Sequence, residues 1–129
     1  MIKHIVLFKL APFAEGNTKH ENALYLKEKL ENLENVIPQL QKIQVVINMP
    51  EVSDKNYDLM LMADFDNLQD LDAYIHHLEH VKVGAFLAKV PTDRAAIDYT
   101  LYPCGVMRGC HHSCGGRLIP FKPLKMISQ

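Results

Sequence analysis

The sequence lacks the features that define several classes of protein. None of its apolar runs approaches the roughly 18–20 residues that a membrane-spanning helix needs. Basic and acidic residues nearly balance, at 14 and 15 in a chain of 129 residues, so no global positive charge favours nucleic acid. The segment from Met1 to Phe8 lacks the length and the cleavage site of a secretory signal. We therefore expect one soluble domain, with neither a membrane nor a nucleic acid as partner.

Cysteine is absent before Cys104, and acidic residues are absent after residue 101. Residues 102–129 hold all three cysteines, four of the six glycines and four basic residues. This shift predicts a domain over residues 1–101 and a basic extension over residues 102–129, which is either mobile or docked on the body or on a partner subunit. The odd number of cysteines and the missing signal indicate the reducing cytoplasm.

The extension also raises the question of a metal. Cys104, Cys110 and Cys114 lie close to His111 and His112, and thiolates with imidazoles are zinc ligands. Their C-x5-C and C-x3-C spacings differ from the paired C-x2-C of a zinc knuckle. An unselected extension, without any site, is the alternative. We predict no metal and no cofactor for this protein.

Two periodicities of apolar residues alternate along residues 1–101. A period of two predicts strands over residues 2–10, 43–47, 57–65 and 95–101. Spacings of three and four predict a helix over residues 18–35, a second over 68–74 and a further helical piece over 81–90. Thr18 and Glu21 have the spacing of a capping box. The order β-α-β-β-α-β predicts a ferredoxin-like α+β fold, with an antiparallel four-stranded sheet and both helices on one face.

The first and third predicted strands are apolar on both faces, although helices can cover only one. Burying one such side chain contributes about 1.5–3 kcal/mol, so a second face left in water is unfavourable. We therefore expect two copies to pack sheet against sheet as a homodimeric α/β barrel. The opposing residues are Ile5 and Leu7 against Val6 and Phe8 in the first strand, and Leu59 and Leu61 against Met60 and Met62 in the third.

Three segments resemble the stress-responsive A/B barrel (Dabb) family. They are residues 3–9, residues 71–83 and residues 94–99. The second segment has Tyr74, His77 and His80 at the spacing of the usual family signature, Tyr-x-x-His-Pro-x-His, with Leu78 in place of the proline. The resemblance covers about residues 1–100 and implies a dimeric α+β barrel. Most members of the family have no assigned reaction.

The resemblance also implies a site. One branch, the plant olivetolic acid cyclase, closes polyketide chains by aldol chemistry, and quinone-forming monooxygenases share the architecture more distantly. By motif, His80 corresponds to the acid/base histidine of the cyclase, Tyr74 to its partner tyrosine and His4 to a further pocket histidine. Histidine, with an ordinary pKa of about 6.5, suits removal of a proton beside a carbonyl, and a phenol can donate a hydrogen bond to the enolate.

Three functions remain open at this point. The first is a homodimer that binds a small hydrophobic molecule in the barrel, without an assigned reaction. The second is a cyclase-like or cofactor-free monooxygenase-like enzyme that uses His80, Tyr74 and His4. The third is a structural assembly protein, in which His77 and His80 only close a helix end and His4 only bonds across the sheet.

The barrel interior distinguishes these functions. If the helices cover Ile5 and Leu7, His4 points into the barrel of the dimer. We expect a ligand there to contact Phe8, Val6, Met60, Met62 and His77. An apolar cavity reached by His4, Tyr74 and His80 favours binding or catalysis, whereas an interior filled by side chains favours a structural role.

Overall fold

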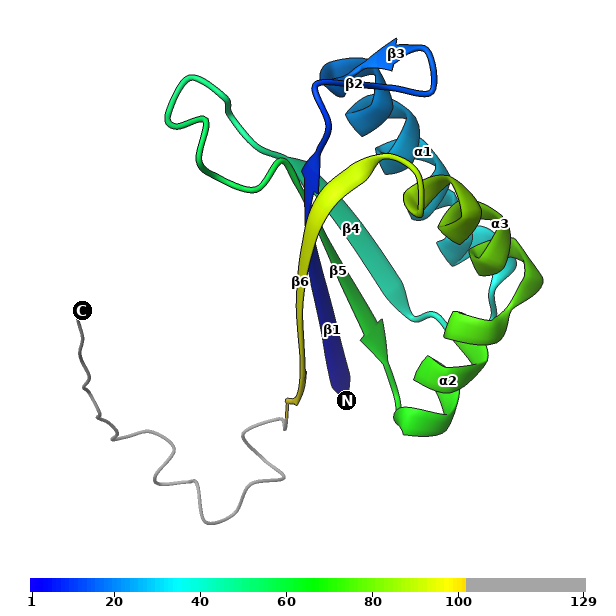
Figure 1. Ribbon diagram of the computed structural model, residues 1–129. Coiled ribbons are helices and arrows are strands. Elements are labelled where there is room, and N and C mark those ends of the chain that lie inside the picture. Colours follow the sequence, from blue (N-terminus) through cyan, green and yellow to red (C-terminus); the bar gives the residue numbers. More distant parts are fainter. Residues whose placement is uncertain (102–129) are drawn as a thin grey trace, which may run out of the picture.

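A computed structural model describes residues 1–101 as one antiparallel sheet with all its helices on one side (Figure 1). The central strands are β1 (Ile2–Leu10) and β5 (Leu59–Phe65), and the edge strands are β4 (Lys42–Ile47) and β6 (Pro91–Thr100). The strand order β4-β5-β1-β6 is that of a ferredoxin-like α+β fold, so the predicted fold class is confirmed. The predicted extension, its docking and its zinc alternative fall in residues 102–129, outside the described residues.

The helix α1 (Lys19–Val36) begins and ends where the sequence places it. Thr18 Oγ1 accepts the Glu21 backbone N–H at 3.2 Å, and Glu21 Oε1 accepts the Thr18 backbone N–H at 2.8 Å, which completes the predicted capping box. Before it, β2 (Phe13–Ala14) and β3 (Asn17–Thr18) form a small hairpin, for which the sequence analysis predicted no strands. Glu15 and Gly16 turn this hairpin with positive φ angles of 49° and 80°.

The second helical region is two helices, α2 (Leu68–His76) and α3 (Leu78–Leu87), separated by His77. Asn67 caps α2 by accepting the Asp70 backbone N–H at 2.8 Å. His77 has an extended backbone and caps α3, because its Nδ1 accepts the Glu79 backbone N–H at 3.1 Å. The sequence analysis predicted that this helix begins at residue 81. The cap explains why it begins at Leu78 instead.

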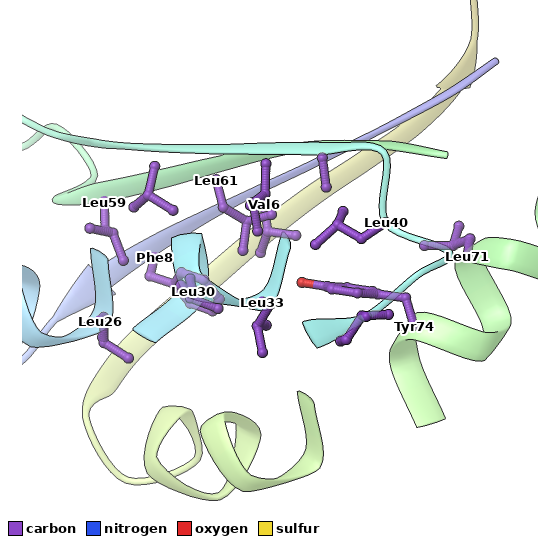
Figure 2. Close-up of a cluster of buried hydrophobic side chains, with 14 of the residues drawn as sticks. Val6, Phe8, Leu26, Leu30, Leu33, Leu40, Leu59, Leu61, Leu71 and Tyr74 are labelled. Carbon is purple, nitrogen blue, oxygen red and sulfur yellow. The ribbon is translucent and has the colours of Figure 1, made fainter. Parts of the chain in front are cut away.

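The helices cover the face of the sheet that carries His4, Val6 and Phe8 in β1, which we call the helix face. The antiparallel register places Ala63, Leu61 and Leu59 of β5 beside them. These side chains pack against Leu26, Leu30 and Leu33 of α1 in the core (Figure 2). The expected site therefore needs a correction, because His4, Val6 and Phe8 point toward the helices of their own chain and not into a barrel between two sheets.

The other side of the sheet, which we call the open face, carries no helix from residues 1–101 (Figure 1). Met60 and Met62 lie here, so they do not share a face with Val6 and Phe8 as the expected ligand site requires. Sequence alone cannot determine which residues of these strands face the helices, because both faces of the central strands are apolar. Ile97 in the middle of β6 is 59% exposed. The apolar residues of the open face are Ile5, Leu7, Val46, Met60, Met62, Ala95, Ile97 and Tyr99.

None of the helices within residues 1–101 is both long enough and apolar enough to cross a lipid bilayer.

Candidate functional site

A cavity of about 300 Å³ lies between the helix face of the sheet and the α2–α3 region, and we call it the helix–sheet cavity. Most of its lining is apolar, which is typical of sites for small organic molecules. Four polar side chains reach it from four different elements, β1, α2, α3 and β6. The apolar lining includes Val6, Phe8, Leu30, Leu61, Ile75, Leu87 and Ala88, Gly84 contributes backbone, and the polar residues are His4, Tyr74, His80 and Arg94.

His80 is held at the junction of α2 and α3. Its Nδ1 lies 3.0 Å from the carbonyl oxygen of Ile75. A carbonyl can only accept, so Nδ1 carries the hydrogen and Nε2, across the ring, holds the lone pair. Burial lowers the pKa of His80, and the nearby histidines lower it further, while the bond to Ile75 opposes them. The neutral ring is therefore favoured near pH 7, and it is the form that can act as a base.

Tyr74 is fully buried beneath the sheet, and its ring centroid lies 4.5 Å from that of His80 and 5.0 Å from that of Phe65. Figure 2 shows the hydroxyl directed away from α2 into the space between the sheet and the leucines of α1. The Tyr74 hydroxyl has no hydrogen-bond partner among the described residues. Burial also raises the pKa of Tyr74 well above its usual range, so the phenol stays protonated and remains a donor.

His4 lies in the middle of β1, is 9% exposed and packs edge-on against Tyr74 at 6.4 Å between ring centroids. Its Nδ1 pairs with the carboxylate of Asp98, which lies directly across from it on β6. A carboxylate favours a hydrogen on Nδ1, which leaves Nε2 of His4 as the acceptor. The predicted bond of His4 across the sheet is thus present, together with its place in the cavity.

The three residues expected to act chemically, His4, Tyr74 and His80, therefore meet at one cavity. Together they offer two imidazole nitrogens with lone pairs and one phenolic donor in a largely apolar space. This combination can take a proton from carbon and stabilise the oxygen of an enolate. Within residues 1–101 no group of three or more histidine, cysteine, aspartate or glutamate side chains is arranged to hold a metal ion.

The structure divides the residues that we expected to contact a ligand. Val6 and Phe8 line the helix–sheet cavity, but Met60 and Met62 lie on the open face. His77 is also outside the cavity, where it caps α3. Its expected contact with a ligand is therefore replaced by a structural role.

Two charged residues of the site, Arg94 and Asp98, were missed by the sequence analysis. Both lie on the helix face of β6, opposite Phe8 and His4. The available signal was their spacing of four, with Asp98 inside the strand predicted over residues 95–101 and Arg94 directly before it, because positions four apart on a strand share a face. What the sequence did not supply was the register of β6 against β1, which places Asp98 beside His4.

A second hollow, of about 440 Å³, lies on the open face at the end of β4. Leu7, Val46 and Met60 form its floor, and the loop between β4 and β5 contributes Lys55, Asn56 and Tyr57. It is larger than the helix–sheet cavity, but none of the three site residues lines it. The helix–sheet cavity is therefore the candidate functional site.

Comparison with known proteins places the chain among ferredoxin-like domains. The family model described as Stress responsive A/B Barrel Domain matches residues 2–101. A dimeric protein of unknown function from Bacteroides fragilis is 34% identical, with a TM-score of 0.62, and the match covers 78% of this chain and 95% of that chain. A dimeric ferredoxin-like protein of unknown function from Thermobifida fusca is 27% identical, with a TM-score of 0.65 and coverage of 78% and 90%.

More distant structures share the fold. A hydroxynitrile lyase from Passiflora edulis is 12% identical, with a TM-score of 0.64, and the match covers 78% of this chain and 93% of that chain. At this identity the likeness is one of architecture alone. No curated protein matches the chain.

Proposed function

The chain belongs to the stress responsive A/B barrel domain family, and from that premise we propose that its helix–sheet cavity binds a small, largely apolar organic molecule. The buried Tyr74 hydroxyl carries this proposal, because it is a donor without a partner among the described residues and belongs to a residue that lines an apolar cavity. Leaving such a group unpaired costs about 1–3 kcal/mol, and an oxygen atom of a bound molecule removes that cost.

Gly84 of α3 provides the test, because it lines the cavity and a Cβ built there meets no atom within 4 Å. We expect Gly84→Leu to occupy the cavity and Gly84→Ala, the matched control, to leave it open. Both changes replace a helical glycine, which favours the helix. 1-Octanol, titrated as a neutral apolar probe, should bind Gly84→Leu at least about tenfold more weakly than Gly84→Ala, the factor that corresponds to 1.4 kcal/mol.

Methyl NMR shifts locate the probe during the same titration. We expect 1-octanol to shift the methyl signals of Val6, Leu61 and Leu87, which line the cavity, and to leave Ile5 and Ile97 of the open face unchanged. Shifts confined to Ile5 and Ile97, or equal affinity of the two Gly84 variants, would contradict binding in the helix–sheet cavity.

We also propose that the chain forms a homodimer through its open face. Its apolar side chains form a continuous patch across the sheet, and each one buried contributes about 1.5–3 kcal/mol. Relatives from Bacteroides fragilis and Thermobifida fusca are described as dimeric. A second copy with the same patch is the self-complementary partner that a two-fold interface requires. Sedimentation of the wild-type protein tests this proposal, and a monomer at micromolar concentration would oppose it.

The compartment that we propose is the cytoplasm. The core of residues 1–101 is built without cysteine, and three cysteines cannot all pair with one another within one chain. Disulfides persist mainly in oxidising compartments, so a chain that does not depend on them suits a reducing one. Fractionation of cells that express the tagged protein tests this assignment.

General-base catalysis is a second candidate function, and the geometry of His80 favours it. The bond from Nδ1 to the carbonyl of Ile75 leaves Nε2 as a base in a ring that burial keeps neutral. Nε2 takes a proton from the carbon beside a carbonyl, the electron pair of the C–H bond enters the enolate, and the Tyr74 hydroxyl donates to the enolate oxygen. Return of a proton from His80 to carbon reverses the step.

Deuterium exchange tests this chemistry without knowledge of the natural substrate. With 2-octanone in deuterated water, each proton that passes to His80 is replaced on carbon by a deuteron from solvent. We expect His80→Gln to slow this exchange at least about 100-fold, the lower range for removal of an acid/base group. The open-face variant Tyr99→Phe, a matched control, should exchange at the wild-type rate. Equal rates for wild type and His80→Gln would exclude His80 as the base.

A further inference from the structure

Arg94 brings a permanent positive charge to the helix–sheet cavity. It lies on β6 opposite Phe8 and is exposed, so it forms part of the rim, whereas Tyr74 is fully buried. Among the side chains that line the cavity in the described part of the chain, Arg94 alone is charged at every physiological pH. Within residues 1–101 no carboxylate lies at ion-pair distance from its guanidinium.

The two carboxylates closest to Arg94 along β6 have other partners. Asp98 pairs with Nδ1 of His4. Asp93 accepts the Tyr57 hydroxyl at 3.0 Å and the backbone N–H of Arg94 at 2.9 Å. Asp93 lies opposite Lys9 in the register, on the face of the sheet away from the cavity. The guanidinium donors of Arg94 therefore stay available to a molecule in the cavity.

We propose that the helix–sheet cavity takes an amphipathic monocarboxylic acid, with its carboxylate on Arg94 and its apolar chain against Val6, Phe8 and Leu61. This inference rests on the proposed binding function and adds the class of the ligand. The planar guanidinium matches a carboxylate with two parallel N–H donors. The charged end stays at the exposed rim, where water still solvates it, and the apolar chain is removed from water.

A single negative charge fits this cavity better than two. His4 already faces the carboxylate of Asp98, and burial lowers the pKa of His80, which keeps that ring neutral. The lining thus offers one permanent positive charge, that of Arg94. A dianion such as a phosphate monoester would need a second one, which the lining does not supply within residues 1–101. At the inner end, the Tyr74 hydroxyl, which has no partner in the described part of the chain, can donate to an uncharged oxygen on the chain of the acid.

Octanoate and 1-octanol test the inference, because they share a chain length and differ in the charge of the head group. We expect wild-type protein to bind octanoate at least about tenfold more tightly than 1-octanol, since hydrogen bonds between charged groups are stronger than those to a neutral hydroxyl. Arg94→Met should lower the affinity for octanoate at least about tenfold and change the affinity for 1-octanol less than about twofold. Arg94→Lys keeps the positive charge but lacks the planar guanidinium, so this variant should lose part of the preference for octanoate over 1-octanol.

Lys89→Met is the matched control, because Lys89 is exposed, lies near the end of α3 and does not line the cavity. It removes the same charge from the chain, and octanoate should bind it within about twofold of wild type. Equal wild-type affinity for octanoate and 1-octanol would overturn the inference, as would equal loss of both probes in Arg94→Met. Either result leaves the proposed binding function intact, whereas failure of 1-octanol to bind the wild type contradicts that function itself.

Discussion

The two faces of the sheet are built from the same strands but have different surroundings. The helix face is closed by α1, α2 and α3 (Figure 1), and Tyr74 lies there among leucines, a valine and a phenylalanine (Figure 2). His4 is also buried on this face. The open face is also apolar in the middle of β1 and β5, yet it has no cover among the described residues. Apolar character alone therefore does not distinguish a core from a docking surface in this protein.

The polar groups on each face make the distinction. On the helix face they have specific surroundings: His80 is bonded to a main-chain carbonyl, His4 is paired with Asp98, and the buried Tyr74 hydroxyl has no partner among the described residues. On the open face the charged residues lie near the ends of the strands, where Lys3 and Asp64 form an ion pair at 2.9 Å. Polar groups inside an apolar cavity fix the position of a ligand, whereas charges around an apolar patch form the rim of an interface.

The largest effect should come from placing a carboxylate on each face in turn. Leu61 and Met62 are neighbours on β5, and only Leu61 is buried by the helices of its own chain. We expect Leu61→Asp to lose more than about 4 kcal/mol of unfolding free energy, because an unpaired charge is buried, and to unfold the protein. Met62→Asp should keep the native circular dichroism spectrum and sediment as a monomer.

The two measurements separate the faces. A Met62→Asp variant that unfolds would show that the chain needs its partner in order to fold, so the open face would be part of one shared core. A Met62→Asp variant that remains dimeric would move the interface away from the open face. A Leu61→Asp variant that stays folded would contradict the assignment of Leu61 to the helix face of β5.

The elements of the fold could be predicted from the sequence, but the parity of the sheet could not. Alternation along residues 2–10 is visible in the sequence, and the capping box at Thr18 is a local signal, so both β1 and α1 were predicted closely. Which side of β1 the helices cover depends on how their apolar stripes dock, and both sides of the strand are apolar. His4 and Met62 were therefore assigned to a common barrel interior, although they lie on opposite faces.

The candidate site was predictable only in part, for a related reason. Tyr74 and His80 are close in sequence, and their family spacing identified them together with His4. His77 belongs to the same motif, but its backbone is extended at the break between α2 and α3, so its ring caps α3. Arg94 and Asp98 depend on the pairing of β6 with β1, which joins residues about 90 positions apart, and such a register has no local signal.

A smaller effect, of opposite sign, should follow from removing a hydroxyl on each face. Tyr74 is buried, and its hydroxyl has no partner within residues 1–101, whereas Tyr99 on the open face is 43% exposed. We expect Tyr74→Phe to raise the unfolding free energy by about 1 kcal/mol, since an unsatisfied buried group is removed. Tyr99→Phe should change it by less than about 0.5 kcal/mol. Urea unfolding at one protein concentration measures both, and a destabilised Tyr74→Phe would show that the hydroxyl has a partner in solution.

The smallest effect should appear in the dependence of stability on pH. Burial lowers the pKa of His80 in the folded protein, whereas in the unfolded chain the pKa has its ordinary value of about 6.5. As the pH falls below that value the unfolded chain binds a proton at His80 first, so stability decreases until the folded protein is protonated as well. His80→Gln should therefore lose less stability than wild type between about pH 7 and pH 5. The control His20→Gln, at an exposed position of α1, should lose as much stability as wild type over this pH range. Identical pH profiles of stability for wild type and His80→Gln would place His80 in water and outside the cavity.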